Sequence, residues 1–172
     1  VSMMKIANDV RWLASGPRCG LGEIDLPSLQ PGSSIMPGKV NPVVPESLLQ
    51  IAAQVIGNDT TIMLAGQGGA FELNTMMPVI AYNLMQSIQL LALGARSFAE
   101  KCISGISANE ATCAAYVEKS LAVATYLVPL LGYDRVAALS KKAYQSDKSI
   151  REIVMEEGIL SEEAFDALLQ AD

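Results

Sequence analysis

The stretch PGSSIMPGKVNPVVPE, residues 31–46, decides how the rest of this sequence is interpreted. It places four prolines and two glycines among serine, lysine, asparagine and glutamate residues. Apolar segments with helical periodicity lie on both sides of it, and turn-forming residues extend the irregular connection over residues 15–42. Loops longer than about 12–15 residues are uncommon in compact domains and are usually functional or disordered. Between helices this strong, we expect a functional loop.

The segments around the loop have the character of long helices. Before it, apolar residues recur at three- and four-residue steps in VSMMKIANDVRWLASG. After it, a helix apolar on nearly every face is predicted to begin near residues 42–45 and to end at the glycines 66, 68 and 69. A third helix is expected from residue 74 or 75 to about 101, with Pro78 in its first turn. Helices of this length are typical of a bundle.

Beyond Gly105 the sequence changes to short amphipathic units with more charge. Ser107 and Glu110 have the spacing of a capping box, and Gly132 and Gly158 suit helix ends. We see no strand-like alternation. The sequence thus predicts an all-α fold with a bundle segment at residues 1–105, including the loop 30–42, and a small helical domain at residues 106–172.

Composition limits the partners that this chain can have. Charged residues make up 17% and apolar residues 51%, so more apolar surface is present than a monomer of this size usually hides. A large core is one explanation, and we favour an extensive subunit interface as the other. A net charge of −6 without a basic run argues against nucleic-acid binding.

Two features bear on the compartment. An odd number of cysteines without CxxC spacing, Cys19, Cys102 and Cys113, argues for reduced thiols in the cytoplasm and against a zinc site, and we expect each to be a small buried side chain. Residues 76–95 are uncharged over the length of a membrane span. Their asparagine, glutamine and serine side chains favour a bundle helix, so we expect no membrane segment.

The polar loop has three candidate roles. A phosphate-binding P-loop is disfavoured because residues 32–39 contain one residue too many and Val40 replaces the magnesium-binding hydroxyl. An anion site with acid–base chemistry fits better, since Ser33 and Ser34 provide hydroxyls, Lys39 a cation and Asn41 an amide. A serine can act as a base only where backbone N–H groups and a cation hold its alkoxide. A plain connector whose polar groups face water is the third possibility.

The motif GSSIMPGKVNPVVPE closely resembles the long shared motif of the fumarase/aspartase superfamily, whose members release fumarate by β-elimination. The likeness continues almost throughout the chain, in GPRCGLGEIDLP, QVIGNDTTI, FELN, NEATCAAYVEKS and GYDRVAALSKKA. The resemblance implies that Ser33 is the base for the Cβ proton and that Ser34, Lys39 and Asn41 bind a small dicarboxylate. It implies that Glu46 is the acid partner of a family histidine.

That histidine is missing, because the chain contains no His. The resemblance therefore implies a C-terminal piece of a longer lyase that assembles as a homotetramer through its helical bundles. We expect the piece alone to be inactive. We find no ligand cluster for a metal and predict no cofactor.

The flanks of the motif favour one branch of the superfamily. LQPGSS, VNPVVPE and VIGNDTT resemble aspartate ammonia-lyases, whereas GPRCG, FELN and GYDRVAALSKKA resemble fumarate hydratases. Residues 74–78, NTMMP, match neither pattern. Argininosuccinate and adenylosuccinate lyases share only the central motif. We therefore favour elimination of ammonia from L-aspartate, with fumarate hydration as the alternative and a crystallin-like scaffold as the non-enzymatic one.

Overall fold

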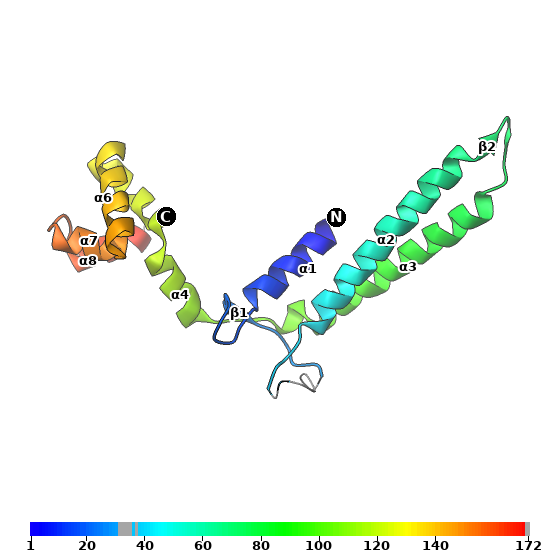
Figure 1. The fold of residues 1–172 in the computed structure, drawn as a ribbon. Helices are drawn as coiled ribbons and strands as arrows, with labels where there is room; N and C mark the ends of the chain where they lie inside the picture. The colour runs from blue at the N-terminus through cyan, green and yellow to red at the C-terminus, as the bar shows by residue number, and fades with distance from the viewer. Residues whose placement is uncertain (31–35, 37, 171–172) are drawn as a thin grey trace. The chain divides into compact units, whose positions relative to one another are not determined.

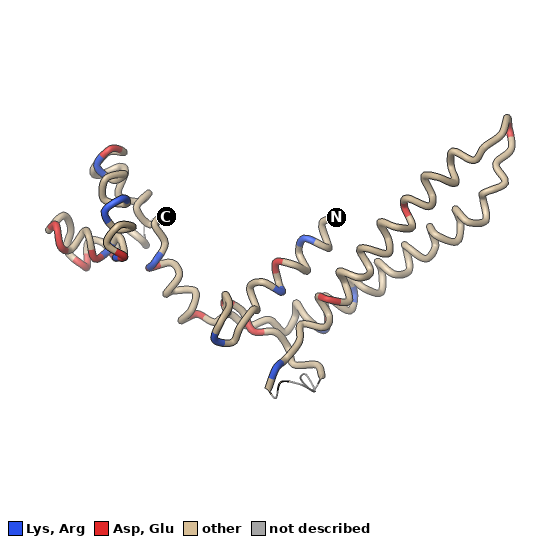
Figure 2. The backbone as a smooth tube through the Cα atoms, viewed as in Figure 1, with Lys and Arg blue, Asp and Glu red and all other residues tan. Residues whose placement is uncertain are grey.

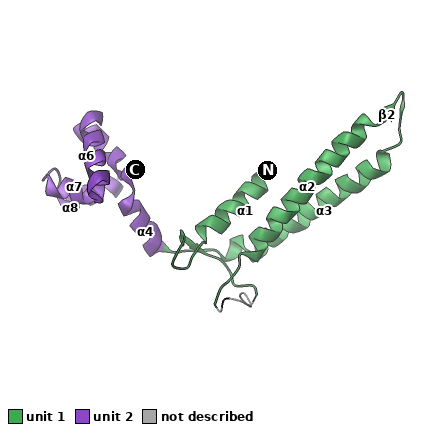
Figure 3. Ribbon diagram, viewed as in Figure 1, with its two compact units in different colours: residues 1–109 green, residues 110–172 purple. Residues whose placement is uncertain are grey.

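The computed structural model describes residues 1–30, 36 and 38–170. It divides into two compact units, residues 1–109 and residues 110–172 (Figure 3). The sequence suggested a division between residues 105 and 106. Each unit is helical, which confirms the all-α fold class.

The first unit is built on two long helices that lie side by side and antiparallel (Figure 1). They are α2 (Val43–Gln67) and α3 (Met77–Lys101), and α1 (Ser2–Leu13) packs against α2. Pro42 precedes α2, Gly68 follows it, and Pro78 lies in the first turn of α3, as the sequence predicted. Because proline lacks an N–H, it costs nothing in a first turn, where that group has no partner within the helix.

The core of this unit is small. Five buried side chains form it, namely Ala7 and Val10 of α1, Leu48 of α2, Phe98 of α3 and Cys102. Many apolar side chains of the two long helices instead remain exposed, among them Met63, Leu64, Met77, Tyr82, Met85, Ile88 and Leu93. Figure 2 shows how few charges these helices carry: α2 contains only Glu46 and Asp59. Part of the apolar excess seen in the sequence therefore lies on the surface of α2 and α3.

Four very short strands are present where the sequence suggested none. β1 (Ile24–Asp25) pairs antiparallel with β4 (Ser107–Ala108), and β2 (Gly69–Ala70) pairs with β3 (Leu73–Asn74) at the turn between α2 and α3. A strand of two residues is too short for an alternating pattern, so it leaves no signal in the sequence. The β1–β4 pairing also explains why Ser107 does not cap a helix: α4 (Glu110–Lys119) begins three residues later.

The second unit contains α4, the 3₁₀ segment η2 (Leu121–Leu127) and four further helices. These are α5 (Val128–Leu131), α6 (Tyr133–Ser146), α7 (Ile150–Glu156) and α8 (Glu162–Gln170). Gly132 and Gly158 have φ values of 80° and 61°, where a side chain would be strained, and both lie at helix ends as predicted. A compact core of ten residues, including Leu127, Ile150, Ile153, Val154 and Phe165, holds the unit together.

Arg151 joins three helices of this unit. Its Nε donates to Glu118 of α4 at 2.8 Å, and an Nη1 hydrogen bond of 2.7 Å reaches Asp166 of α8. The guanidinium also lies 4.8 Å from the ring centroid of the buried Phe165. A planar fork of donors suits this double contact better than a lysine would.

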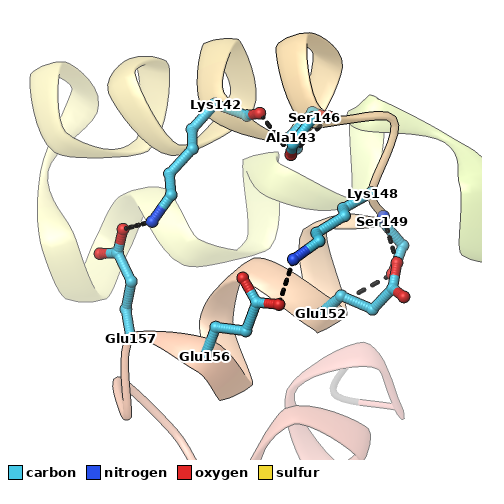
Figure 4. A network of polar contacts seen from close by, with 8 residues as sticks. All are labelled: Lys142, Ala143, Ser146, Lys148, Ser149, Glu152, Glu156 and Glu157. Carbon is cyan, nitrogen blue, oxygen red and sulfur yellow. Dashed lines mark hydrogen bonds and ion pairs between the residues drawn. The ribbon is translucent and has the colours of Figure 1, made fainter.

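The capping box of this unit lies at the start of α7 and not at Ser107 (Figure 4). The Ser149 N–H donates to Glu152 at 2.7 Å, while the Glu152 N–H donates to Ser149 Oγ at 3.2 Å. The Lys148–Glu156 ion pair lies beside it, and the Lys142–Glu157 ion pair lies beyond that pair on the same side (Figure 4). The spacing Ser-x-x-Glu is readable at both places, but only residue 149 lies beside a helix start.

Within the described residues no single helix combines the length and the hydropathy needed to cross a bilayer. One pair of segments, Glu110–Lys119 with Leu121–Leu131, passes on length and composition together, and it is bent by 65°.

Gly94 allows α2 and α3 to approach closely. A Cβ added there would lie 2.7 Å from Ile51 Cδ1 and 3.4 Å from Leu48 Cδ1, whereas at Gly57 nothing lies within 4 Å. We predict that Gly57→Ala raises the free energy of unfolding by about 0.5–1 kcal/mol through helix propensity. Gly94→Ala should raise the free energy of unfolding by less than Gly57→Ala does, because Ile51 Cδ1 must move away from the new methyl group. Urea unfolding of both variants measures the difference, and equal gains would contradict the close packing.

The capping box predicts a pH dependence. Hydrogen bonds from the Ser149 N–H, and then from its hydroxyl, lower the pKa of Glu152 below its ordinary value of 4.5. A lowered carboxyl pKa stabilises the fold above pH 4.5, and this contribution is lost as the pH falls through the lowered pKa. Glu152→Gln should therefore unfold at a lower temperature than the wild type at pH 7, with the two curves converging in acid. Thermal scans across this range that stay parallel would refute the assignment.

Candidate functional site

The described part of the polar loop leads directly into α2. Gly38 has a φ of 80°, and the following Lys39 donates its N–H to Met36 O at 3.2 Å, which closes a turn. Asn41 O accepts from the Val43 N–H at 2.9 Å, and Pro42 O accepts from the Glu46 N–H at 3.0 Å. The last two bonds lead from Asn41 and Pro42 into the first turn of α2.

The structure gives the predicted site residues different surroundings. Lys39 is exposed, Asn41 is half-buried, and Glu46 is half-buried in the first turn of α2. A carboxylate at this position interacts favourably with the positive end of the helix dipole. Ser33 and Ser34 lie outside the described residues. Lys39 and Asn41 thus lie just before the N-terminal end of α2, and Glu46 lies in its first turn.

Two cavities border this end of α2. A groove of about 580 Å³ runs between α2 and α3 and is mainly apolar, with Ser47, Ser97 and Lys101 as its polar residues. A much smaller cavity of about 10 Å³ is lined by Asn41 and Pro42 together with Lys101 and Cys102. The large groove has few of the hydrogen-bond donors and cations that would bind a dicarboxylate, whereas the sequence of the polar loop provides them.

Lys101 is a cation that the sequence analysis missed. It lies in the last turn of α3, where a positive charge suits the helix dipole, and it borders both cavities. In the sequence, the only indication of a role for Lys101 was its position near the C-terminal end of a predicted helix. The structure places it near the loop because α3 runs antiparallel to α2.

The cysteines are placed in three different environments. Cys102 is buried in the core, and burial raises the pKa of its thiol, so it stays protonated and unreactive. Cys113 is half-buried, and Cys19 is exposed, so the expectation of burial is wrong for Cys19. Within the described residues, no three His, Cys, Asp or Glu side chains are grouped as metal ligands.

Comparisons with known proteins match both ends of the chain to lyases. The family model for lyases matches residues 1–57, and the model for the fumarase C C-terminus matches residues 123–172. A class II fumarate hydratase of Thermosynechococcus vestitus is 53% identical over 96% of the chain. The chain belongs to the fumarase/aspartase superfamily. Lys39, Asn41 and Glu46 all lie within the segment matched by the lyase model.

Other relatives in the superfamily are named for a different enzymatic activity. An aspartate ammonia-lyase of Bacillus subtilis is 52% identical over 98% of the chain. Among solved structures, the fumarate lyase:delta crystallin from Brucella melitensis aligns over 97% of the chain with 49% identity and a TM-score of 0.90. The chain spans only 35% to 36% of the length of these three proteins. The sequence similarity assigns the chain to the superfamily. It is nearly equal for the fumarate hydratase and for the aspartate ammonia-lyase, so it does not distinguish the two activities.

Proposed function

We propose that this chain supplies the C-terminal part of a lyase that forms fumarate by β-elimination from a four-carbon dicarboxylate. The observation that carries the proposal is the polar loop at the start of α2, where Lys39, Asn41 and Glu46 lie within eight residues. The superfamily assignment supports it, because fumarate hydratases and aspartate ammonia-lyases both make or consume fumarate.

In the proposed reaction, the chain binds a carboxylate and helps to remove a proton from the neighbouring carbon. Ser33 Oγ takes the Cβ proton, and the electron pair moves into the adjacent carboxylate as an aci-carboxylate. The Lys39 ammonium and the Asn41 amide stabilise that added negative charge, together with Ser34 at the carboxylate. The bond to the leaving group then breaks, and its electron pair departs with ammonia, or with a hydroxyl group that takes a proton from a group outside this chain and leaves as water.

Glu46 has a supporting role in this proposal. It holds and charges a histidine that comes from outside this chain, in the manner of a carboxylate–imidazole pair. The proposal needs further segments and copies, and the exposed apolar faces of α2 and α3 suit assembly into a homotetramer. No cofactor enters the proposed reaction.

Ser33 is tested in the complete protein. Ser33→Ala should lower kcat by about 10²-fold or more, because general-base catalysis contributes about that much. Ser28→Ala is the matched control, an exposed serine of the same connection outside the motif. If the rates of fumarate formation are the same for both variants, Ser33 is only part of a connecting loop. That result would support the non-enzymatic alternative, in which the chain is a crystallin-like scaffold.

The leaving group is decided by a direct assay. From the loop flanks we expect fumarate, measured by its ultraviolet absorbance, to form from L-aspartate and not from L-malate when the complete protein is used. The 172-residue chain alone should form none from either, because the histidine partner is absent. Turnover of L-malate would assign fumarate hydration instead, and turnover by the chain alone would show that its own residues suffice.

A further inference from the structure

A polar cluster lies in the middle of the otherwise apolar contact between α2 and α3. Asn58 of α2 is 2% exposed. Its Nδ2 lies 2.9 Å from Gln86 Oε1, 3.0 Å from Ser87 Oγ and 3.4 Å from Asn83 O, all on α3. Its Oδ1 accepts from Gln54 Nε2 at 2.9 Å. Every polar atom of this buried amide is therefore matched by a partner.

The partners of Asn58 do not depend on it. The Ser87 hydroxyl donates to Asn83 O at 2.8 Å, and the Asn83 amide donates to Val79 O at 2.8 Å. Gln54 is exposed and Gln86 is half-buried, so both can turn to water. An apolar residue of similar size at position 58 would leave none of these groups without a hydrogen-bond partner. A buried polar group that can be replaced at little cost contributes little net stability.

Such a group contributes instead to specificity, as buried asparagines do between other paired helices. In the observed register Ile51 lies against Gly94, and seven residues further along α2 Asn58 lies against Ser87, seven residues earlier on α3. A slip of one helical turn toward the C-terminal end of α3 would bring the Asn58 amide against Leu90 and Leu91. The Nδ2 group would then lose its hydrogen bonds to Gln86 Oε1 and Ser87 Oγ and face apolar side chains, while Gln54 of the same helix still donates to Oδ1, so that register is disfavoured.

We propose that Asn58 sets the register of α2 on α3 and thereby positions the N-terminal end of α2, with Lys39, Asn41 and Glu46. One turn corresponds to about 5.4 Å along the helix. A displacement of about 1 Å in a catalytic group can cost about 10²-fold in rate, so a register error would remove the geometry that the reaction needs. The second half of the proposal rests on the proposed function; the first half does not.

The register is measured in the 172-residue chain by NMR. The Ile51 δ1 methyl group contacts the position of Gly94, so an Ile51–Gly94 Hα nuclear Overhauser effect reports the observed register. We expect Asn58→Leu to weaken this signal by about half or more and to add a second set of resonances, with the melting temperature changed by less than about 4 °C. Gln50→Leu, a change of the same kind at an exposed position of α2 outside the cluster, should keep one set of resonances.

Two results would overturn the proposal. One is an unchanged, single Ile51–Gly94 signal in Asn58→Leu, which would show that other contacts set the register. The other is a large drop in melting temperature with the signal retained, which would make Asn58 a stabilising residue only. Asn58→Ala, which cannot crowd the site, is measured in parallel, and failure of both variants to fold counts as the second result.

The complete protein supplies the second readout. If Asn58 positions the start of α2, Asn58→Leu should lower kcat at least about tenfold, whereas Gln50→Leu should not. Inactivity of the wild-type protein toward both dicarboxylates would reject the proposed function and leave the NMR result standing. Unchanged kcat in an active protein whose register has slipped would reject the positioning role alone.

Discussion

The contact between α2 and α3 is the constraint on which the first unit depends. Both helices are 25 residues long and largely apolar, and dispersion and hydrophobic burial act without direction. Such forces favour any arrangement that hides apolar area. Two features distinguish one arrangement from its neighbours: the missing side chain at Gly94, which admits Ile51, and the buried amide of Asn58, which must find its partners on α3.

This constraint reaches the polar loop because a helix transmits position along its axis. Backbone hydrogen bonds join Asn41 and Pro42 to the first turn of α2, which begins at Val43, fifteen residues before Asn58. Loops carry functional groups, but rigid elements give them their positions. The same antiparallel arrangement brings Lys101, from the far end of α3, to the cavity lined by Asn41. A second cation thus arrives near the loop through packing and not through sequence proximity.

The sequence revealed those elements whose signals are long or chemically distinct. The ends of α2 and α3 follow from Pro42, Gly68 and Pro78, and the superfamily follows from a motif of fifteen residues. The two-residue strands could not be seen, because they are too short to show an alternating pattern, and the β1–β4 pair also joins segments more than eighty residues apart, such as Ile24 and Ala108. That pairing also displaced the expected capping box. Asn58 was visible only as part of a motif, although an asparagine in a helix apolar all round is itself a signal for a buried polar contact.

The similarity to two kinds of enzyme has a physical explanation within the proposed reaction. Aspartate and malate share both carboxylates and the carbon that loses its proton, and they differ only in the group that leaves. Lys39 and Asn41 are assigned to a carboxylate, and Ser33 to the proton, so all act on the shared part of the substrate. A segment with only these tasks has no reason to differ between the two reactions. Near-equal identities of 53% and 52% to a fumarate hydratase and to an aspartate ammonia-lyase agree with that argument. Discrimination between ammonia and water then belongs to groups that face the leaving group, including the histidine that this chain does not contain.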